Sequence, residues 1–252
     1  MSGRVALVTG ASSGIGRAAV VELRRRGVRV MAVARRARLL DQLAGETGAC
    51  YVACSLDSRA GCEQAVEATR SQLGPIEILV NSAALGTGED GSVLDLEWDA
   101  WRRTMNLDLD VPFLLTKLAA ADMTRSGWGR VIMVGSTAGQ VGGAQMTAYC
   151  AAKHGLLGLV RATAIDLAGY QVTCNAVMPG WVRTEMAERA AERAAAATGV
   201  AVEEIWAQRA RSYPAGRVVT PAEVAATIAF LASDEASGVN GQAVTVALGS
   251  LW

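Results

Sequence analysis

Short apolar runs alternate along the chain with longer segments whose apolar residues recur at helical spacing. Each run has the length and the β-branched content of a buried strand, and most runs are apolar at consecutive rather than alternate positions. This pattern predicts seven strands, at Val5–Thr9, Val28–Ala34, Cys50–Cys54, Ile76–Asn81, Arg130–Ser136, Gln171–Pro179 and Ala243–Ala247.

The segments between these runs predict helices, among them residues 17–27, 39–47 and 60–73. Strands separated by helices are typical of parallel pairing through right-handed crossovers. Helices on both faces of the sheet also explain strands that have no polar side. The chain shows no internal repeat and no linker. We therefore predict an α/β fold in which residues 1–252 form a single domain with a doubly wound parallel sheet of about seven strands.

One segment, residues 181–216, breaks the alternation between the sixth strand and the last helix. It contains "MAERAAERAAAATG", which predicts a helix rich in Ala, Glu and Arg. Long insertions of this kind often close over a site as lids. The same composition also suits a surface helix with high intrinsic propensity. Both interpretations stay open.

Composition narrows the function classes. The chain has 24 basic and 24 acidic residues and is 51% hydrophobic. A net charge of zero argues against a nucleic-acid-binding protein, which usually presents a basic face. No uncharged apolar stretch reaches the roughly 20 residues needed to cross a bilayer, and no long apolar segment precedes the turn at Gly10. We expect a cytoplasmic protein that binds neither nucleic acid nor a membrane.

Cysteine and histidine are few. The five cysteines have no CxxC spacing, which favours reduced thiols over a disulfide framework. A zinc site needs several cysteine or histidine ligands at set spacings, and the one histidine is His154. We expect no metal, and no catalytic role for His154.

A glycine-rich turn, "VTGASSGIGRA" (Val8–Ala18), joins the first predicted strand to the first predicted helix. Its glycines allow a tight turn and the close approach of a ligand, and the helix that follows offers unpaired N–H groups to a pyrophosphate. The turn predicts a dinucleotide site; a tight βα turn that binds nothing is the alternative. The candidate residues are Gly10, Ser12, Ser13, Gly14, Ile15 and Gly16.

The end of the second predicted strand indicates which nicotinamide cofactor binds. In such folds an acidic residue at this place holds the adenosine ribose hydroxyls. Here Ala34 is followed by Arg35 and Arg36, and Arg17 follows the glycine turn. Arginine binds phosphate well. These residues predict NADPH or NADP+, unless the arginines are merely solvated.

The stretch "AYCAAKHGLLG" (Ala148–Gly158) places Tyr149 and Lys153 four residues apart, so both lie on one helix face. A lysine cation nearby stabilises a phenolate and lowers the pKa of a tyrosine. Such a tyrosine can give a proton to a ketone oxygen or take one from an alcohol. Alternatively, the pair is a core tyrosine with a lysine that reaches solvent.

The T-G-x-x-x-G-x-G turn at Thr9–Gly16 and the Y-x-x-x-K pair resemble the short-chain dehydrogenase/reductase family, from Arg4 to about Leu251. This resemblance implies a Rossmann-like fold, and a homotetramer or homodimer. Ser136, thirteen residues before Tyr149, resembles the family's catalytic serine, and Asn106 in "RTMNLDLDVPF" its catalytic asparagine. The implied catalytic residues are Asn106, Ser136, Tyr149 and Lys153.

The resemblance also implies contacts to the cofactor. "LVNSAA" (Leu79–Ala84) is similar to the family's L-V-N-N-A-G, and "MPGWVRT" (Met178–Thr184) to its P-G-x-x-x-T run. In "CSLD" no acidic residue stands where the family contacts adenine, which leaves a backbone contact. The residues implied to bind the cofactor, besides the turn and Tyr149 and Lys153, are Leu56, Asn81, Ala83, Pro179, Gly180, Val182 and Thr184.

We expect the substrate site to be mainly apolar, lined by Ser136, Gln145, Tyr149, Trp181 and Met186. The resemblance implies NADPH-dependent reduction of a ketone in a medium-sized substrate of polyketide or 3-oxoacyl type, with Tyr149 as general acid. Two alternatives stay open. One is an alcohol dehydrogenase of hydroxybutyrate or cyclic-alcohol type, and the other is a non-catalytic NADP(H)-binding protein.

Overall fold

The computed structural model describes residues 1–250; Leu251 and Trp252, the end of the predicted domain, lie outside the described residues. Within residues 1–250, seven parallel strands form one sheet in the order β3-β2-β1-β4-β5-β6-β7. This confirms the predicted fold class. The strands are β1 (Val5–Thr9), β2 (Arg29–Ala34), β3 (Cys50–Ala53), β4 (Ile78–Asn81), β5 (Gly129–Val134), β6 (Val172–Pro179) and β7 (Ala243–Val246).

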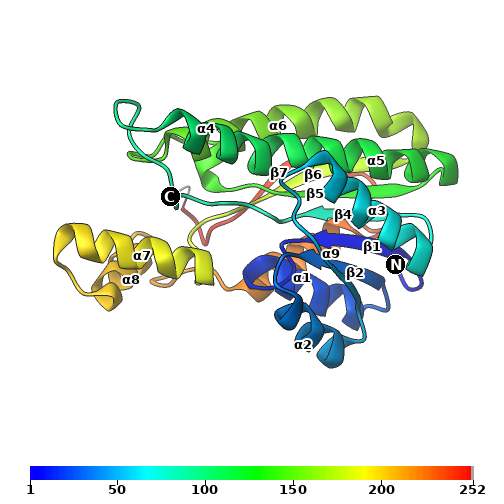
Figure 1. The fold of residues 1–252 in the computed structure, drawn as a ribbon, viewed down its shortest axis with the longest axis horizontal. Coiled ribbons are helices and arrows are strands. Elements are labelled where there is room, and N and C mark those ends of the chain that lie inside the picture. The colour runs from blue at the N-terminus through cyan, green and yellow to red at the C-terminus, as the bar shows by residue number, and fades with distance from the viewer. Residues whose placement is uncertain (251–252) are drawn as a thin grey trace.

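Helices cover both faces of the sheet (Figure 1). One face carries α1 (Gly14–Arg25), α2 (Ala37–Thr47) and α9 (Pro221–Leu231). The other carries α3 (Arg59–Leu73), α5 (Val111–Ser126) and α6 (Thr147–Leu167). Before α5, α4 (Trp98–Met105) runs into a π-helix, η1 (Asn106–Asp110). After β6 come α7 (Glu185–Thr198) and α8 (Val202–Arg211), and two 3₁₀ turns are η2 (Thr137–Gly139) and η3 (Ala168–Tyr170).

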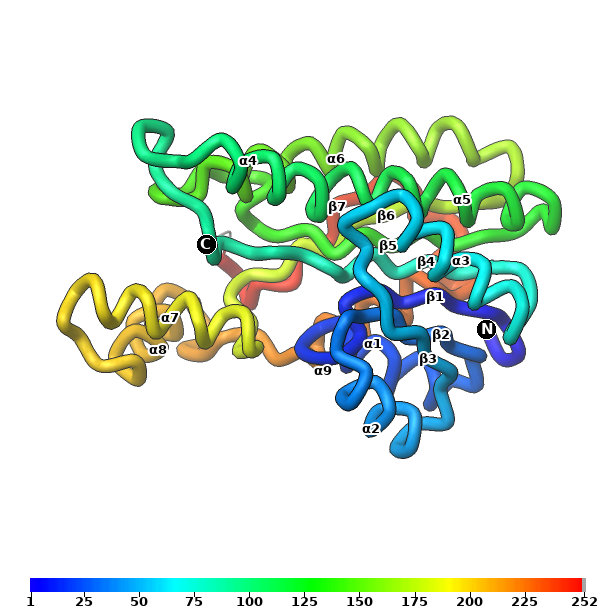
Figure 2. Tube along the Cα trace, in the orientation of Figure 1, coloured from blue at the N-terminus to red at the C-terminus, as the bar shows by residue number. Residues whose placement is uncertain are grey.

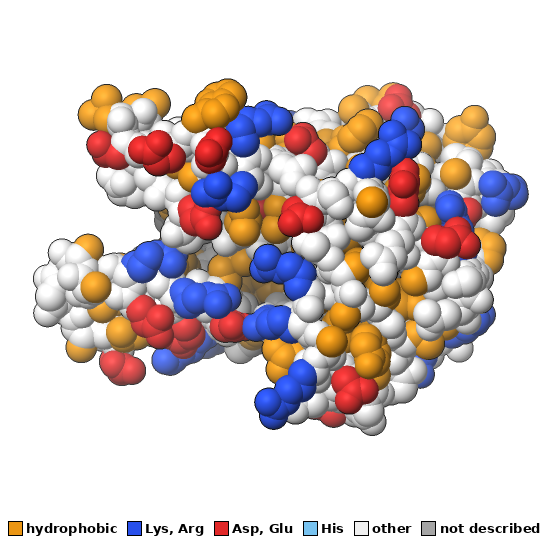
Figure 3. Space-filling model, in the orientation of Figure 1, with side chains coloured by type: hydrophobic (Ala, Val, Ile, Leu, Met, Phe, Trp, Pro, Cys, Tyr) orange, Lys and Arg blue, Asp and Glu red, His pale blue; other side chains and the backbone are white. Residues whose placement is uncertain are grey.

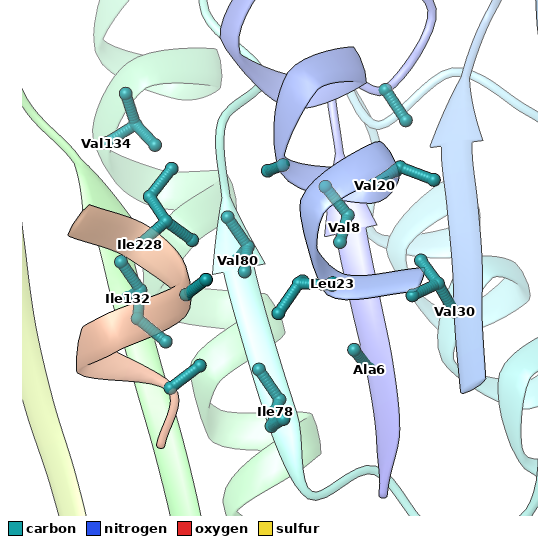
Figure 4. Close-up of a cluster of buried hydrophobic side chains, with 14 of the residues drawn as sticks. Ala6, Val8, Val20, Leu23, Val30, Ile78, Val80, Ile132, Val134 and Ile228 are labelled. Carbon is teal, nitrogen blue, oxygen red and sulfur yellow. The ribbon is translucent and has the colours of Figure 1, made fainter. Parts of the chain in front are cut away.

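The consecutive apolar residues of each strand divide between two cores. In β1, Ala6 and Val8 face α1 and lie near its Leu23, and Ile228 of α9 extends the same core over Ile132 of β5 (Figure 4). Leu7 belongs to the core on the opposite face. Side chains alternate between the faces of a strand. A strand covered on both sides therefore needs apolar residues at every position, which is the pattern that predicted the sheet.

Element boundaries differ from the predictions by a few residues. Helix α1 begins at Gly14 rather than at Arg17, because extended Ser13 precedes it directly. Strand β5 stops at Val134 and does not include Ser136, which begins the η2 turn and accepts a hydrogen bond from the Ala138 N–H at 3.2 Å. Both differences occur just after the carboxyl end of a strand, β1 in one case and β5 in the other.

Helices α7 and α8 form an arm that extends from one end of the sheet (Figures 1 and 2). A small apolar cluster of their own holds them together, made of Ala187, Ala191, Ile205 and Trp206. The space-filling view shows the surface hollowed between this arm and the part of the molecule that carries α4 (Figure 3). The order of the strands reverses between β1 and β4, which is where doubly wound sheets bind their ligands.

Candidate active site

A cleft of about 510 Å³ lies at the carboxyl ends of the strands. It brings together residues that the sequence predicted from separate motifs along the whole chain. Those that line it are Gly10, Ser12, Ser13, Gly14, Ile15, Gly16, Arg35, Arg36, Leu56, Ala83, Asn106, Tyr149, Lys153, Thr184 and Met186.

A smaller cavity of about 90 Å³ adjoins the cleft. Ser136, Gly180 and Trp181 line it, and apolar side chains complete most of the wall. Tyr149 and Met186 line both spaces, so they mark the junction between them. The large cleft contains most of the predicted cofactor residues, and the small cavity contains most of the predicted substrate residues.

The glycine turn approaches its neighbours so closely that side chains do not fit. A Cβ at Gly16 would lie 2.4 Å from the carbonyl oxygen of Gly10. A Cβ at Gly10, which has φ +65°, would lie 2.8 Å from the Ser82 carbonyl oxygen. Helix α1 starts at this turn, and its first N–H groups have no partner within the helix. A narrow turn lining a cleft with such N–H groups fits a pyrophosphate.

The two arginines at the end of β2, Arg35 and Arg36, differ in their hydrogen bonds and ion pairs. Arg36 donates to the Ser12 hydroxyl at 3.0 and 3.1 Å and pairs with Glu185 of α7 at 2.5 Å. Arg35 is exposed at the cleft and has no hydrogen bond or ion pair among the described residues. Arg17 does not line the cleft and pairs with Glu46 instead. Arg35 is therefore the cation best placed to accept an added phosphate.

Tyr149 and Lys153 lie on one face of α6, as the spacing predicted. The Lys153 ammonium is 5.4 Å from the centre of the Tyr149 ring, and it donates to the Val134 carbonyl at 3.3 Å. Val134 ends β5 beside Ser136. Helix α6 and the end of β5 thus bring the serine, the tyrosine and the lysine together.

The predicted pKa of Tyr149 was wrong in its net direction. Tyr149 borders the cleft, but protein surrounds its phenol group, and this burial raises the pKa of Tyr149. Lys153 and a hydrogen bond with Ser136 lower that pKa, whereas Asp108 raises it further. The net result is a pKa above the usual value, because burial disfavours the phenolate. Tyr149 therefore keeps its proton at neutral pH.

A family model described as "Enoyl-(Acyl carrier protein) reductase" matches residues 10–250. The D-beta-hydroxybutyrate dehydrogenase of Cupriavidus necator is 34% identical over 249 residues, covering 96% of this chain and 95% of its own. The granaticin polyketide synthase putative ketoacyl reductase 1 of Streptomyces violaceoruber is 36% identical over 249 residues, covering 96% and 91%. The chain belongs to the short-chain dehydrogenase/reductase family.

A solved structure agrees with this assignment. The crystal structure of an actinorhodin polyketide ketoreductase variant with NADPH matches at a TM-score of 0.93 and 34% identity, covering 97% of this chain and 96% of that one. The predicted family and enzyme class are confirmed. This short-chain dehydrogenase/reductase is an oxidoreductase that uses a nicotinamide cofactor and acts on a C=O or CH–OH group.

Several predicted residues lie outside both spaces. Asn81 ends β4 and is buried, with its amide nitrogen 3.5 Å from the Thr116 hydroxyl. Pro179 ends β6, and Val182 forms a bridge with Val219. Gln145 is exposed before α6. These four residues shape the surroundings of the cleft but do not line the spaces described.

Asn106 and Thr184 line the cleft, and each also has a structural contact. The Asn106 amide donates to the Asp57 carbonyl at 2.8 Å, which ties the start of η1 to the loop after β3. Thr184 caps α7 by accepting a hydrogen bond from the Ala187 N–H at 3.3 Å.

Sequence reasoning missed Asp90, which lies in the loop between β4 and α4. Its two carboxylate oxygens accept hydrogen bonds from the N–H groups of Ala148 at 3.0 Å and Tyr149 at 2.8 Å. Asp90 thus caps the first turn of α6 from a distant part of the chain, where Met146 supplies no side-chain cap. Local sequence carries no signal for this contact, because the partners are 58 and 59 residues apart.

Sequence reasoning also missed Asp108 in η1. This side chain has no exposed surface; one oxygen accepts from the Leu85 N–H at 2.9 Å, and the other lies 3.4 Å from the Lys153 ammonium. An acidic residue two positions after Asn106, between Leu107 and Leu109, was the available signal.

Within residues 1–250, no group of three or more His, Cys, Asp or Glu side chains is placed to hold a metal ion, and the five cysteines are unpaired thiols. No helix within residues 1–250 is long and apolar enough to cross a membrane.

Proposed function

We propose that the chain reduces a ketone of a medium-sized, largely apolar substrate to a secondary alcohol with NADPH, and that Tyr149 is the general acid. The observation that carries this proposal is the place of Tyr149 at the junction of the two spaces, beside Ser136 and Lys153. The relatives named as ketoacyl and polyketide ketoreductases support the substrate class.

The large cleft would hold the cofactor. The turn Gly10–Gly16 would take the pyrophosphate on its N–H groups, and Arg35 would pair with the 2′-phosphate that distinguishes NADPH from NADH. Leu56, Ala83 and Thr184 would border the adenine and nicotinamide ends. When bound, the nicotinamide supplies the hydride.

The chain's own residues would handle the proton. A ketone in the small cavity meets the Tyr149 hydroxyl, which keeps its proton and can donate it to the carbonyl oxygen. The Ser136 hydroxyl would donate to the same oxygen and stabilise the charge that develops there. Lys153 would stabilise the phenolate left on Tyr149. Asn106, which lines the cleft, would hold a water molecule that links Lys153 to solvent, as the family resemblance implies.

The apolar wall of the small cavity supports a substrate with little charge. Ala138, Met146, Trp181, Met186 and Ala190 contribute to it. We propose in addition that residues 181–216 act as a lid of a single domain, because Trp181 and Met186 connect the α7–α8 arm to the cavity wall.

The assembly and location belong to the same proposal. Phe113 on α5 and Ile165 on α6 are large apolar side chains that are 52% and 79% exposed. Such residues suit an interface between copies of this chain. We propose a cytoplasmic homotetramer or homodimer. Leu156, Leu157 and Val160 belong to the core and do not contribute to such an interface.

Alcohol oxidation is the second candidate, and the hydroxybutyrate dehydrogenase relative favours it. The same residues would run in reverse, with Tyr149 as the base. We place reduction ahead of oxidation because more of the similar proteins are named as reductases, among them the ketoacyl reductase and the polyketide ketoreductase.

The test compares the protein with its Tyr149→Phe variant on a bicyclic ketone, an acetoacetyl thioester and a cyclic diketone, with NADPH or NADH. We expect turnover with NADPH and a loss of roughly 10²–10⁴-fold in Tyr149→Phe, the usual contribution of a general acid. Tyr170→Phe is the matched control, because Tyr170 is exposed on η3 beyond the end of α6 and lines neither space.

Each other outcome rejects a part of the proposal. Comparable rates in Tyr149→Phe would rule out Tyr149 as the acid, and equal turnover with NADH at low concentration would rule out the choice of NADPH. Turnover of alcohols with NADP+ but of no ketone would favour the dehydrogenase candidate. Tight NADPH binding without any turnover would indicate a non-catalytic binding protein.

A further inference from the structure

The Tyr213 hydroxyl makes a contact that joins the two ends of the segment 181–216, which contains the α7–α8 arm. Tyr213 follows α8, and its phenol oxygen accepts a hydrogen bond from the backbone N–H of Trp181 at 2.5 Å. The two residues are 32 positions apart in the chain. Within residues 1–250 this is the one hydrogen bond of the Trp181 N–H, so that N–H depends on Tyr213 for its partner.

The space around the phenol oxygen is narrow. Tyr213 is 2% exposed, and a Cβ at Gly180 would lie 2.2 Å from its oxygen. The ring can therefore reach the Trp181 N–H only because residue 180 has no side chain. Burial raises the pKa of Tyr213, while the Trp181 N–H and Arg209 act against that rise. The phenol is neutral at neutral pH, and its oxygen serves as an acceptor.

Other contacts hold Trp181 from the same part of the chain. Its carbonyl accepts a hydrogen bond from the Val219 N–H at 3.0 Å, and the next residue, Val182, forms a bridge with Val219. The Arg209 guanidinium lies 3.7 Å from the centre of a Trp181 ring. Both backbone groups and the ring of Trp181 are thus held by α8 and the residues that follow it.

The residues that contact the Tyr213 oxygen belong to the wall of the small cavity. Gly180 and Trp181 line that cavity together with Ser136 and Tyr149. Tyr213 itself lines neither the cavity nor the large cleft. Its hydroxyl therefore lies directly behind the wall and acts on a bound molecule through Gly180 and Trp181.

We infer that Tyr213 is a positioning residue whose hydroxyl fixes Gly180 and Trp181 in the wall of the small cavity. Its effect on turnover rests on the proposed function, in which this cavity holds the ketone. The hydrogen bond itself does not, so it can be tested in the protein without cofactor or ketone.

Tyr213→Phe removes the phenol oxygen and keeps the ring that fills the space. Ser212→Ala is the matched control, because it removes a hydroxyl from the neighbouring residue. That hydroxyl donates to the Arg209 carbonyl at 2.7 Å and has no bond to the cavity wall.

Hydrogen exchange of the Trp181 amide measures the contact directly. The chain has six tryptophans, so ¹⁵N-tryptophan labelling gives a simple amide spectrum, and Trp181→Phe assigns the signal. We expect the Trp181 amide to exchange roughly 3- to 10-fold faster in Tyr213→Phe, as the loss of one neutral hydrogen bond implies. Ser212→Ala should leave it unchanged. Equal exchange rates in Tyr213→Phe and the unchanged protein would overturn the inference.

Gly180→Ala tests the same contact from the other side and keeps Tyr213. The new Cβ would meet the phenol oxygen, so the ring must move away and the Trp181 amide should again exchange faster. Unchanged exchange in Gly180→Ala would contradict the inference even if Tyr213→Phe failed to fold.

The two changes together give a further check. Without the oxygen, the nearest ring atom lies 3.0 Å from the Cβ of residue 180. We expect Gly180→Ala to lower the midpoint of thermal unfolding less in Tyr213→Phe than in the unchanged protein, since residues in contact are not additive. Equal losses in the two backgrounds would mean that the oxygen does not meet residue 180, and the inference would fail.

Kinetics then show whether the position of the wall matters for the ketone. We expect Tyr213→Phe to raise the ketone KM several-fold, with smaller changes in kcat and in the dissociation constant for NADPH. A residue that only stabilises the fold would lower the midpoint of unfolding and leave the ketone KM of the folded protein unchanged, which would contradict the inference. If the unchanged protein turned over no ketone, the proposed function would fail, whereas the exchange of the Trp181 amide would still decide the role of Tyr213.

Discussion

The two ends of the cleft are built in different ways. At the cofactor end, backbone packs on backbone: the Gly16 Cα lies so near the Gly10 carbonyl that a Cβ would come within 2.4 Å of it. At the substrate end, side chains from η2, α6 and α7 converge, and Trp181 and Met186 come from a segment that packs on its own small cluster. The tight backbone packing at the cofactor end admits one ligand shape. The side chains at the substrate end could change without disturbing the sheet.

The arm that carries the substrate end has few ties to the main core. Besides the cluster around Trp206, ion pairs such as Arg183–Glu188 and Arg211–Glu204 hold it, and their side chains are a third to nearly two thirds exposed. Exposed pairs contribute little to stability. Segments with small cores and exposed contacts open at lower free energy than the core of a domain, which suits a lid.

Gly16→Ala should have the largest effect on cofactor binding and stability, because it adds a side chain at the cofactor end, where the backbone leaves no space. The added Cβ would meet backbone rather than a flexible side chain, so the glycine turn must shift. We expect NADPH affinity to fall by roughly 100-fold, the equivalent of one lost hydrogen bond to a charged group, and the free energy of unfolding to fall by about 1–3 kcal/mol. Calorimetric titration and thermal unfolding measure the two.

Gly45→Ala provides the control for this change. Gly45 lies within α2, is exposed, and has nothing within 4 Å of the position of an added Cβ. Alanine there should stabilise the protein by up to about 1 kcal/mol, because glycine is unfavourable inside helices. Normal NADPH affinity in Gly16→Ala would mean that the turn is not the phosphate site.

Arg35→Ala should have the next largest effect, confined to one cofactor. A charged hydrogen bond contributes about 1.5–3 kcal/mol, so the dissociation constant for NADPH should rise roughly 10- to 100-fold while that for NADH stays constant. Arg36→Ala should change it less, because Ser12 and Glu185 already engage that guanidinium. Arg38→Ala, exposed on α2, is the control. Equal losses for both cofactors would refute a contact to the 2′-phosphate.

The features that could be predicted from the sequence are those that depend on residues close together in the chain. The sheet was predictable because each strand is buried on both faces, and the glycine turn and the Tyr149–Lys153 pair because their partners lie a few residues apart. The contacts of Asp90 and Asp108 were not, because the fold alone brings them to α6. Nor could the sequence show that Arg17 lies outside the lining of the cleft, because its partner Glu46 comes from α2.

Arg209→Met should have the smallest effect of these variants, and it should alter ketone binding but not NADPH binding. The guanidinium of Arg209 lies between the rings of Trp181 at 3.7 Å and Trp206 at 4.6 Å, and it donates to the Ala187 carbonyl at 3.2 Å. Its burial lowers the pKa of Arg209 to about 10, which indicates how closely the arm encloses it. Methionine keeps the length of the side chain but loses the charge.

Loss of the cation–π contacts should cost about 1–2 kcal/mol and loosen Trp181, which lines the substrate cavity. We expect the ketone KM to rise several-fold while the dissociation constant for NADPH stays the same. Arg211→Met is the control, since Arg211 is an exposed residue of α8 that pairs with Glu204. If Arg209→Met instead weakened NADPH binding and left the ketone KM unchanged, the arm would serve the cofactor end, and the division of the cleft into two independently built ends would be wrong.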